Sequence, residues 1–297
     1  MSSTPLIETI NVNLWSKCNL RCAYCYGDFP ERPRQASREE WLAILEAVAP
    51  YTRRITFCGG EPTLNPHVGE LLDKVQSLGL QTSIITNGAK LTERLVEKLD
   101  LVGMTLDATD EPTLRALGRS TPTWPDYYAG LRRCVAMIHR VGRPILKLNT
   151  VVSRLNLHVD LVAALRELEP SKWKPLQFTV VVGENEHRAE ALSITRAEFD
   201  AFVARHREQL PASIWVAPEE DDTVRSTYVM VDPSGRLFST ATGGKLFSAP
   251  ILDVGLERAF AQVGGYDRER FVARGGHVDV VQRRRLSVLP GGAASPE

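Results

Sequence analysis

The stretch Glu8-Thr-Ile-Asn-Val-Asn-Leu-Trp-Ser-Lys-Cys18-Asn-Leu-Arg-Cys22-Ala-Tyr-Cys25 decides the fold. Its first half alternates apolar and polar residues, which predicts a β-strand over residues 8–15. Three of the chain's five cysteines follow directly at positions 18, 22 and 25. An odd number of cysteines, crowded in this way, suits a metal site in a reducing compartment better than a disulfide framework.

The spacing of these cysteines favours an iron–sulfur cluster. A [4Fe–4S] cluster normally takes four thiolates, so Cys18, Cys22 and Cys25 would leave one iron open to chelate S-adenosylmethionine (SAM). One electron from such a cluster can cleave the sulfonium and release a 5′-deoxyadenosyl radical. A structural zinc site is the alternative, but zinc needs a fourth Cys or His, and none follows closely. Cys58 and Cys134 are scattered, and we interpret both as small buried hydrophobic residues.

A second motif, Gly59-Gly60-Glu61-Pro62, follows the second predicted strand. Glycines allow close approach of the backbone to a ligand, and a carboxylate can accept a hydrogen bond from the SAM ammonium group. On its own this motif would indicate a turn. After CxxxCxxC with an aromatic residue before the last cysteine, it indicates cofactor binding and is typical of radical SAM enzymes.

The remaining sequence alternates short apolar runs with amphipathic stretches up to about residue 182. Among these stretches, residues 37–51 predict a helix with Ser37 and Glu40 as its capping box, and residues 91–99 predict another helix. Parallel strands with right-handed crossovers follow from this alternation, and six such units predict a partial (β/α)6 TIM-type barrel within residues 1–185. Residues 186–282 predict a C-terminal α+β extension that covers the nucleotide site, with a helix at 194–208, a hairpin turning at 232–235 and short helices at 255–273. The basic, Pro/Gly-rich residues 283–297 predict a disordered tail. The strands are expected at 8–15, 53–58, 81–86, 101–108, 144–152 and 173–182.

Composition excludes several classes of partner. Lys+Arg and Asp+Glu both number 36, so the net charge is zero and no global field for nucleic acid or membrane is present. The first ten residues lack the pattern of a secretory signal, and no apolar run approaches a membrane span. We therefore expect a cytoplasmic protein that binds neither nucleic acid nor membrane directly.

The later segments resemble the viperin family of radical SAM enzymes, which make antiviral nucleotides. The resemblance runs from about residue 10 to residue 280, and a partial barrel with a C-terminal extension agrees with it. Its most specific blocks are KLNTVVSRLN (147–156), SKWKPLQFTVVVGEN (171–185), STYVMVDP (226–233), ILDVGLE (251–257) and the stretch from Tyr266 to Gly276.

This resemblance implies an activity. The radical would take the C4′ hydrogen of a ribonucleoside triphosphate, the 3′-hydroxyl would leave as water, and a second electron would complete the reaction. The product is a 3′-deoxy-3′,4′-didehydro nucleotide (ddhCTP from CTP) that terminates RNA synthesis in antiviral defence. CTP is the first expectation, with UTP or GTP as alternatives, and a flavodoxin- or ferredoxin-type donor would supply the electrons.

The resemblance also implies site residues. On the SAM side, Thr105 would contact the ribose and Arg119 the carboxylate, beside the GGEP motif. The nucleotide positions that carry over are Asn11, Arg54, Lys147, Asn149, Lys174 and Tyr228. Independently of the family, side chains at the carboxyl ends of barrel strands converge on one site. Three cations there suit a triphosphate, whereas a single lysine in an apolar strand would more often snorkel or pair with a carboxylate.

Three departures from the family bear on the substrate. Asp221 stands where viperins usually carry an asparagine, and an ionised Asp only accepts hydrogen bonds. Cys58 replaces a serine before GGEP, and FSTATGG (238–244) differs from the usual block. A modified nucleotide such as a nucleotide sugar is therefore an alternative substrate. A peptide or RNA substrate would predict auxiliary cysteines or a basic appendage, and a non-catalytic protein would predict loss of a cluster cysteine; neither is seen.

Overall fold

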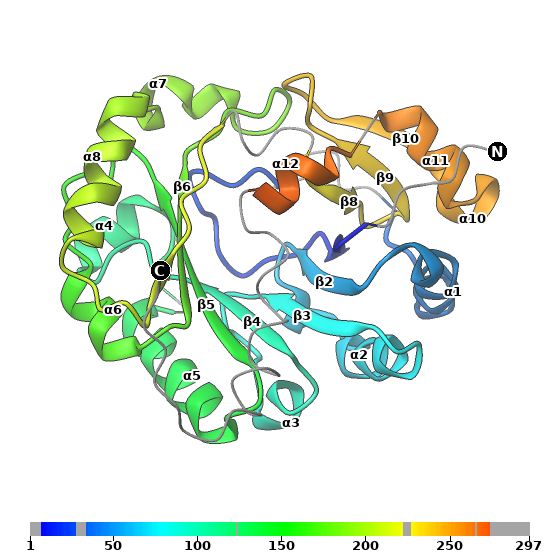
Figure 1. The fold of residues 1–297 in the computed structure, drawn as a ribbon, viewed down its shortest axis with the longest axis horizontal. Helices are drawn as coiled ribbons and strands as arrows, with labels where there is room; N and C mark the ends of the chain where they lie inside the picture. Colours follow the sequence, from blue (N-terminus) through cyan, green and yellow to red (C-terminus); the bar gives the residue numbers. More distant parts are fainter. Residues whose placement is uncertain (1–6, 28–33, 123, 222–226, 265, 274–297) are drawn as a thin grey trace, which may run out of the picture.

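A single curved sheet organises the molecule (Figure 1). The computed structural model describes residues 7–27, 34–122, 124–221, 227–264 and 266–273. The strands run in the order β10-β9-β8-β1-β2-β3-β4-β5-β6-β7, and β1 to β7 pair in parallel. The partial barrel predicted from the sequence is thus confirmed. Its parallel strands are β1 (Ile10–Trp15), β2 (Arg54–Gly59), β3 (Gln81–Ile85), β4 (Leu101–Thr105), β5 (Ile145–Val152), β6 (Lys172–Gln177) and β7 (Trp215–Val216).

Helices cover the outer, convex face of the sheet (Figure 1). Ser37 and Glu40 form the predicted capping box at the start of α1, and Thr195 and Glu198 form a second one at the start of α8. These caps fix where two of the covering helices begin. The helices are α1 (Arg38–Val48), α2 (Val68–Ser77), α3 (Glu93–Val96), α4 (Glu111–Ala116), α5 (Tyr127–Val141), α6 (Val162–Leu168), α7 (Ala189–Leu192) and α8 (Arg196–Arg207).

The two-residue period of the strands separates the core from the barrel interior. In β1, for example, Ile10, Val12 and Leu14 are fully buried in the hydrophobic core, whereas Asn11 lines the interior cavity. The same alternation in β5 places Leu146 and Leu148 in the core and turns Lys147 to the cavity. Apolar burial therefore holds the helices on the sheet while polar residues stay available inside it.

The C-terminal extension continues the same sheet. Strand β8 (Val229–Val231) pairs in parallel with β1, and β9 (Arg236–Ser239) forms the predicted hairpin with it. Strand β10 (Leu246–Pro250) adds to β9 in antiparallel. Three helices follow: α10 (Ile251–Val254), α11 (Leu256–Val263) and α12 (Arg268–Ala273). The predicted tail at 283–297 lies outside the described residues.

Three details differ from the sequence expectations. Strand β6 ends at Gln177 rather than near residue 182, because the chain then turns over the mouth of the barrel and Gly183 takes a φ of 86°. The helix expected at 91–99 shortens to α3, and the two-residue strand β7 was too short to give a periodic signal. In the described part of the chain, no helix combines the length and apolar character that crossing a membrane requires.

Candidate active site

The interior of the barrel holds one large cavity of about 1160 Å³. Its wall includes the three predicted cluster cysteines at one end and the predicted cationic residues of β2, β5 and β6. Of the predicted site residues, Pro62 and Asp221 do not line the cavity. The Asp221 amide instead donates to Oε1 of Gln177 (3.4 Å), and Gln177 lines the cavity. The predicted residues that line the cavity are Asn11, Cys18, Cys22, Cys25, Arg54, Gly59, Gly60, Glu61, Thr105, Arg119, Lys147, Asn149, Lys174 and Tyr228.

Backbone contacts fix the loop that carries the cysteines. The amides of Arg21 and Ala23 donate to the carbonyls of Gly118 (3.3 Å) and Leu117 (3.0 Å), which follow α4. Gly118 has a φ of 70°, and a Cβ there would lie 1.9 Å from the Arg21 carbonyl oxygen. Only glycine therefore allows this approach. The cluster loop is held against the barrel by backbone geometry that CxxxCxxC itself does not reveal.

The sulfurs of this loop receive N–H donors. Asn87 Nδ2 lies 3.8 Å from Cys18 Sγ, the Leu20 amide lies 3.4 Å from the same sulfur, and Arg119 Nη1 lies 3.7 Å from Cys22 Sγ. Burial raises the pKa of Cys18 and Cys22, and among the opposing influences are the Leu20 amide for Cys18 and Arg119 for Cys22. Such donors stabilise thiolates and help to set the reduction potential of an iron–sulfur cluster. All three cysteines are half-buried.

This donor set fits a [4Fe–4S] cluster better than a single metal ion. Among the described residues, no three His, Cys, Asp or Glu side chains converge on one ion-sized point. Cluster thiolates each bind a different iron, so they need no such convergence. The zinc alternative from the sequence gains no support. Cys18, Cys22 and Cys25 would hold the cluster, which when bound supplies one electron to SAM.

A buried polar group that the sequence did not reveal supports the cluster loop. Asp107, fully buried at the end of β4, accepts from Arg119 Nε (3.0 Å), the Tyr24 hydroxyl (2.5 Å) and the Val151 amide (2.9 Å). Burial raises the pKa of Asp107, and the Arg119 guanidinium opposes that rise. The only signal in the sequence was an Asp near the end of the strand predicted at 101–108, which is too common to assign a role.

Arg119 is oriented for an anion. Asp107 holds its Nε, and its guanidinium stacks 4.7 Å from the Tyr127 ring centroid. Its buried Nη2 finds no hydrogen-bond partner within the described part of the chain. An unsatisfied buried donor of this kind is costly unless a ligand fills the role. The position fits the predicted contact with the SAM carboxylate.

Glu61 has several protein partners, and its contact with the SAM ammonium group stays a prediction. Its carboxylate is fully buried and accepts from the Thr63 amide and hydroxyl, the Thr86 hydroxyl and the Asn87 amide, at 2.5–3.0 Å. Burial raises the pKa of Glu61 and these hydrogen bonds lower it. The carboxylate thus ties the GGEP loop to Asn87, the neighbour of Cys18. The glycine before it serves close backbone packing, because a Cβ on Gly60 would lie 2.3 Å from the Lys17 carbonyl oxygen.

The other part of the cavity wall is cationic. Arg54 opens β2, Lys147 lies on β5, and both Lys172 and Lys174 of β6 line the cavity because residues two apart share a face. Lys172 Nζ lies 4.1 Å from the centroid of the Trp215 ring. Lys172 was not among the site residues predicted from the sequence, although its two-residue spacing from Lys174 indicates the same face of the strand. The buried Oδ1 of Asn149 has no partner among the residues that the structure describes.

Lys174 and Tyr228 form a triad with a residue that was also missed. Buried Glu219 pairs with Lys174, and the Tyr228 hydroxyl lies 2.7 Å from both Lys174 Nζ and Glu219 Oε2. Lys174 therefore carries a carboxylate partner, as the alternative reading for a strand lysine anticipated. Glu219 sits in the cavity wall because it continues the β6 pairing beyond β7.

Comparisons with known proteins agree with this geometry. The Radical SAM superfamily model matches residues 12–166. A "S-adenosylmethionine-dependent nucleotide dehydratase" from Flammeovirga pacifica is 35% identical over 290 residues, which are 93% of this chain and 97% of that protein. A protein of the same description, named RSAD2, from Siniperca chuatsi is 28% identical and covers 90% of this chain and 78% of its own length.

Solved structures agree on the fold. Streptococcus suis SuiB bound to SAM superposes with a TM-score of 0.63 at 18% identity, covering 79% of this chain and 60% of that one. The enzyme anSMEcpe with bound AdoMet gives 0.65 at 17% identity, covering 86% and 80%. The chain therefore belongs to the radical SAM superfamily, whose enzymes use a [4Fe–4S] cluster and SAM, and within it to the viperin family of SAM-dependent nucleotide dehydratases.

Proposed function

We propose that this dehydratase converts a ribonucleoside triphosphate, CTP first, to its 3′-deoxy-3′,4′-didehydro analogue. The observation that carries the proposal is that the cluster cysteines and a group of cationic strand residues open into one cavity of about 1160 Å³. A pocket for one drug-sized ligand usually spans about 300–1,000 Å³. A larger cavity with a thiol end and a cationic wall suits SAM and a polyanionic nucleotide together.

Each part of the cavity wall has a proposed role. Arg119 would bind the SAM carboxylate and Thr105 the SAM ribose. Arg54, Lys147 and Lys172 would bind the phosphates, because cations that line one cavity match a polyphosphate. Asn11 and Asn149 would contact the nucleotide ribose, and Lys174, Tyr228 and Glu219 would complete its surroundings. Asp221, which does not line the cavity, would act on the nucleotide through Gln177.

The chemistry sets what the residues must do. With cluster and SAM bound, one-electron cleavage of SAM provides the group that takes the C4′ hydrogen, and the protein's part is to hold C4′ close and exclude water. Loss of the 3′-hydroxyl as water then requires one proton and a second electron. We propose that a flavodoxin- or ferredoxin-type donor in the cytoplasm supplies both electrons, and that the product serves antiviral defence.

Binding in the unreduced holoenzyme tests the phosphate assignment without turnover. CTP should bind more tightly than CDP and CMP, and cytidine least. Lys147→Ala should weaken CTP binding by about 10- to 100-fold, since a hydrogen bond to a charged group contributes about 1.5–3 kcal/mol. Lys90→Ala is the control, because Lys90 is exposed and outside the cavity lining. Equal affinity of Lys147→Ala and the parent would remove the assignment.

A further inference from the structure

The loop after β6 and the loop between β9 and β10 meet across the open side of the barrel. The Val182 amide donates to the Gly243 carbonyl (2.9 Å), and Val182 forms an isolated parallel bridge with Gly244. We call residues 182–184 and 243–245 the clasp. Figure 1 shows the two loops side by side, so the clasp joins the end of the barrel to its C-terminal extension.

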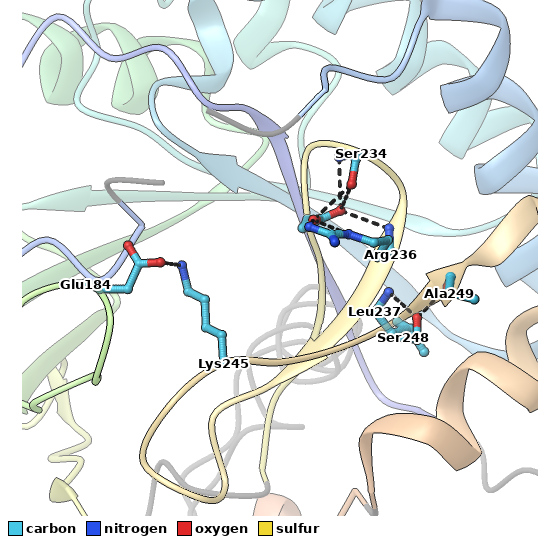
Figure 2. A network of polar contacts seen from close by, with 8 residues as sticks. Glu184, Ser234, Arg236, Leu237, Lys245, Ser248 and Ala249 are labelled. Carbon is cyan, nitrogen blue, oxygen red and sulfur yellow. Dashed lines mark hydrogen bonds and ion pairs between the residues drawn. The ribbon is translucent and has the colours of Figure 1, made fainter. Parts of the chain in front are cut away.

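A buried ion pair completes the clasp. Glu184 and Lys245 are bonded through their side chains (Figure 2), and only 7% and 4% of these side chains are exposed. Lys245 Nζ also lies 5.4 Å above the Phe238 ring. Burial lowers the pKa of Lys245 and the bond to Glu184 opposes this. A buried pair of this kind is maintained only if both partners stay in place, since one charge left alone would be strongly unfavourable.

The Lys245 side of the clasp belongs to the strands β8 to β10, which hydrogen bonds join into one part of the sheet. Asp232, fully buried, accepts from the amides of Ser234 and Arg236 (both 2.9 Å) and from the Arg236 guanidinium. Farther along, Ser248 Oγ accepts from the Leu237 amide at 3.0 Å. Figure 2 shows this network beside the Glu184–Lys245 pair. Lys245 directly precedes Leu246, which pairs with Ser239 at the other end of β9, so the β9–β10 ladder holds the backbone next to Lys245.

The Glu184 side of the clasp reaches the cluster loop. The next residue, Asn185, is 2% exposed; its Nδ2 donates to the Tyr24 carbonyl (3.3 Å) and its Oδ1 accepts from the Val181 amide (2.8 Å). Glu184 and Asn185 both line the cavity, whereas Lys245 does not. Tyr24 directly precedes Cys25. A shift of Glu184 would thus be passed through Asn185 to the loop that holds the cluster.

We propose that Lys245 is a positioning residue, which through Glu184 keeps the loop after β6 closed over the cluster loop and so keeps water and oxygen away from the cluster. The physical need is clear, because a radical reaction requires a dry site that does not lose its intermediates to solvent. The proposal rests on the radical SAM cofactors and not on the nucleotide assignment. It can therefore succeed or fail independently of the substrate.

Oxygen bleaching of the cluster in SAM-free holoenzyme tests the proposal. The cluster of Lys245→Met should bleach at least tenfold faster than that of the parent, which corresponds to a loss of about 1.4 kcal/mol in the free energy of loop closure. Lys245→Arg keeps the charge, so its cluster should bleach near the parent rate. Lys74→Met is the matched control, because it breaks an exposed pair with Glu46 on the outer helices. If Lys245 had a purely structural role, Lys245→Met would lower the melting temperature but would not make the cluster bleach faster than in Lys74→Met.

A second variant protects the test against misfolding. Glu184→Gln keeps the shape and a hydrogen-bond acceptor for Lys245 but removes one charge, and it should also bleach faster than Lys74→Met. In cluster-free protein, iodoacetamide should label Cys25 faster in both clasp variants, with Cys134 as the internal reference for general unfolding. Parent-like bleaching and labelling in whichever clasp variants fold would overturn the proposal.

Discussion

Replacing Gly118 by alanine should detach the cluster loop from an otherwise intact barrel. The new Cβ would lie 1.9 Å from the Arg21 carbonyl oxygen and 2.7 Å from its carbon, whereas real Cβ contacts essentially never fall below 3.0 Å. The loop must therefore move by more than 1 Å. The left-handed φ of 70° costs a non-glycine residue roughly 1–2 kcal/mol of folding free energy. Loss of the two loop hydrogen bonds to residues 117 and 118 adds about 0.5–1.5 kcal/mol each.

The assay is iron and sulfide content after anaerobic reconstitution, with urea unfolding of the cluster-free protein alongside. Gly79→Ala is the matched control, because Gly79 has a φ of 74° but nothing within 4 Å of the new Cβ. The free energy of unfolding of Gly79→Ala should fall only by the cost of the left-handed φ, and this variant should keep a full cluster. Gly118→Ala should lose a total of about 2–5 kcal/mol and most of its cluster. A fully loaded Gly118→Ala enzyme that cleaves SAM at the parent rate would refute the reasoning.

Three further predictions follow from the site and the core. Cys18→Ala should abolish both the cluster and 5′-deoxyadenosine formation, whereas Cys134→Ala should keep both, as shown by visible absorption and chromatography. Asp107→Asn should lower the free energy of unfolding by about 3–5 kcal/mol, because Arg119 keeps a buried charge without its partner, and urea unfolding would show this. His206, buried with Nε2 accepting from an amide at 3.0 Å, has a pKa lowered from 6.5 mainly by burial. The unfolded chain thus binds a proton that the folded chain does not, so the free energy of unfolding should fall as the pH drops below about 6.5, and His206→Gln should flatten that slope.

The sequence predicted the barrel because its signals are local. Alternating apolar runs, the capping box at Ser37 and Glu40, and the turn at residues 232–235 all depend on neighbours along the chain, and the structure has each of them. The cavity lining was predictable for a related reason. Residues two apart on a strand share one face, so the inward-facing Lys147 of β5 and Lys174 of β6 line the same cavity as the cluster loop, and Arg54 joins them from the amino end of β2.

The partners of the site residues were not predictable in the same way. Glu219 pairs with Lys174 only because the chain beyond β7 lies beside β6. Asp107 meets Tyr24 across 83 residues, and no periodicity encodes that contact. The contact of Glu61 with SAM stays a prediction, and the motif did not reveal that the oxygens of Glu61 also accept from donors of two neighbouring loops. Motifs thus identified which residues matter, and tertiary contacts decided what each of them touches.

The central claim is most directly tested by anaerobic turnover with each nucleotide in turn. The reconstituted enzyme is reduced in the presence of SAM and offered CTP, UTP, GTP or ATP separately, and both 5′-deoxyadenosine and nucleotide products are followed by mass spectrometry. One triphosphate, CTP first, should stimulate SAM cleavage and yield a product lighter by one water. Slow SAM cleavage that no triphosphate stimulates, with every nucleotide recovered unchanged, would contradict it.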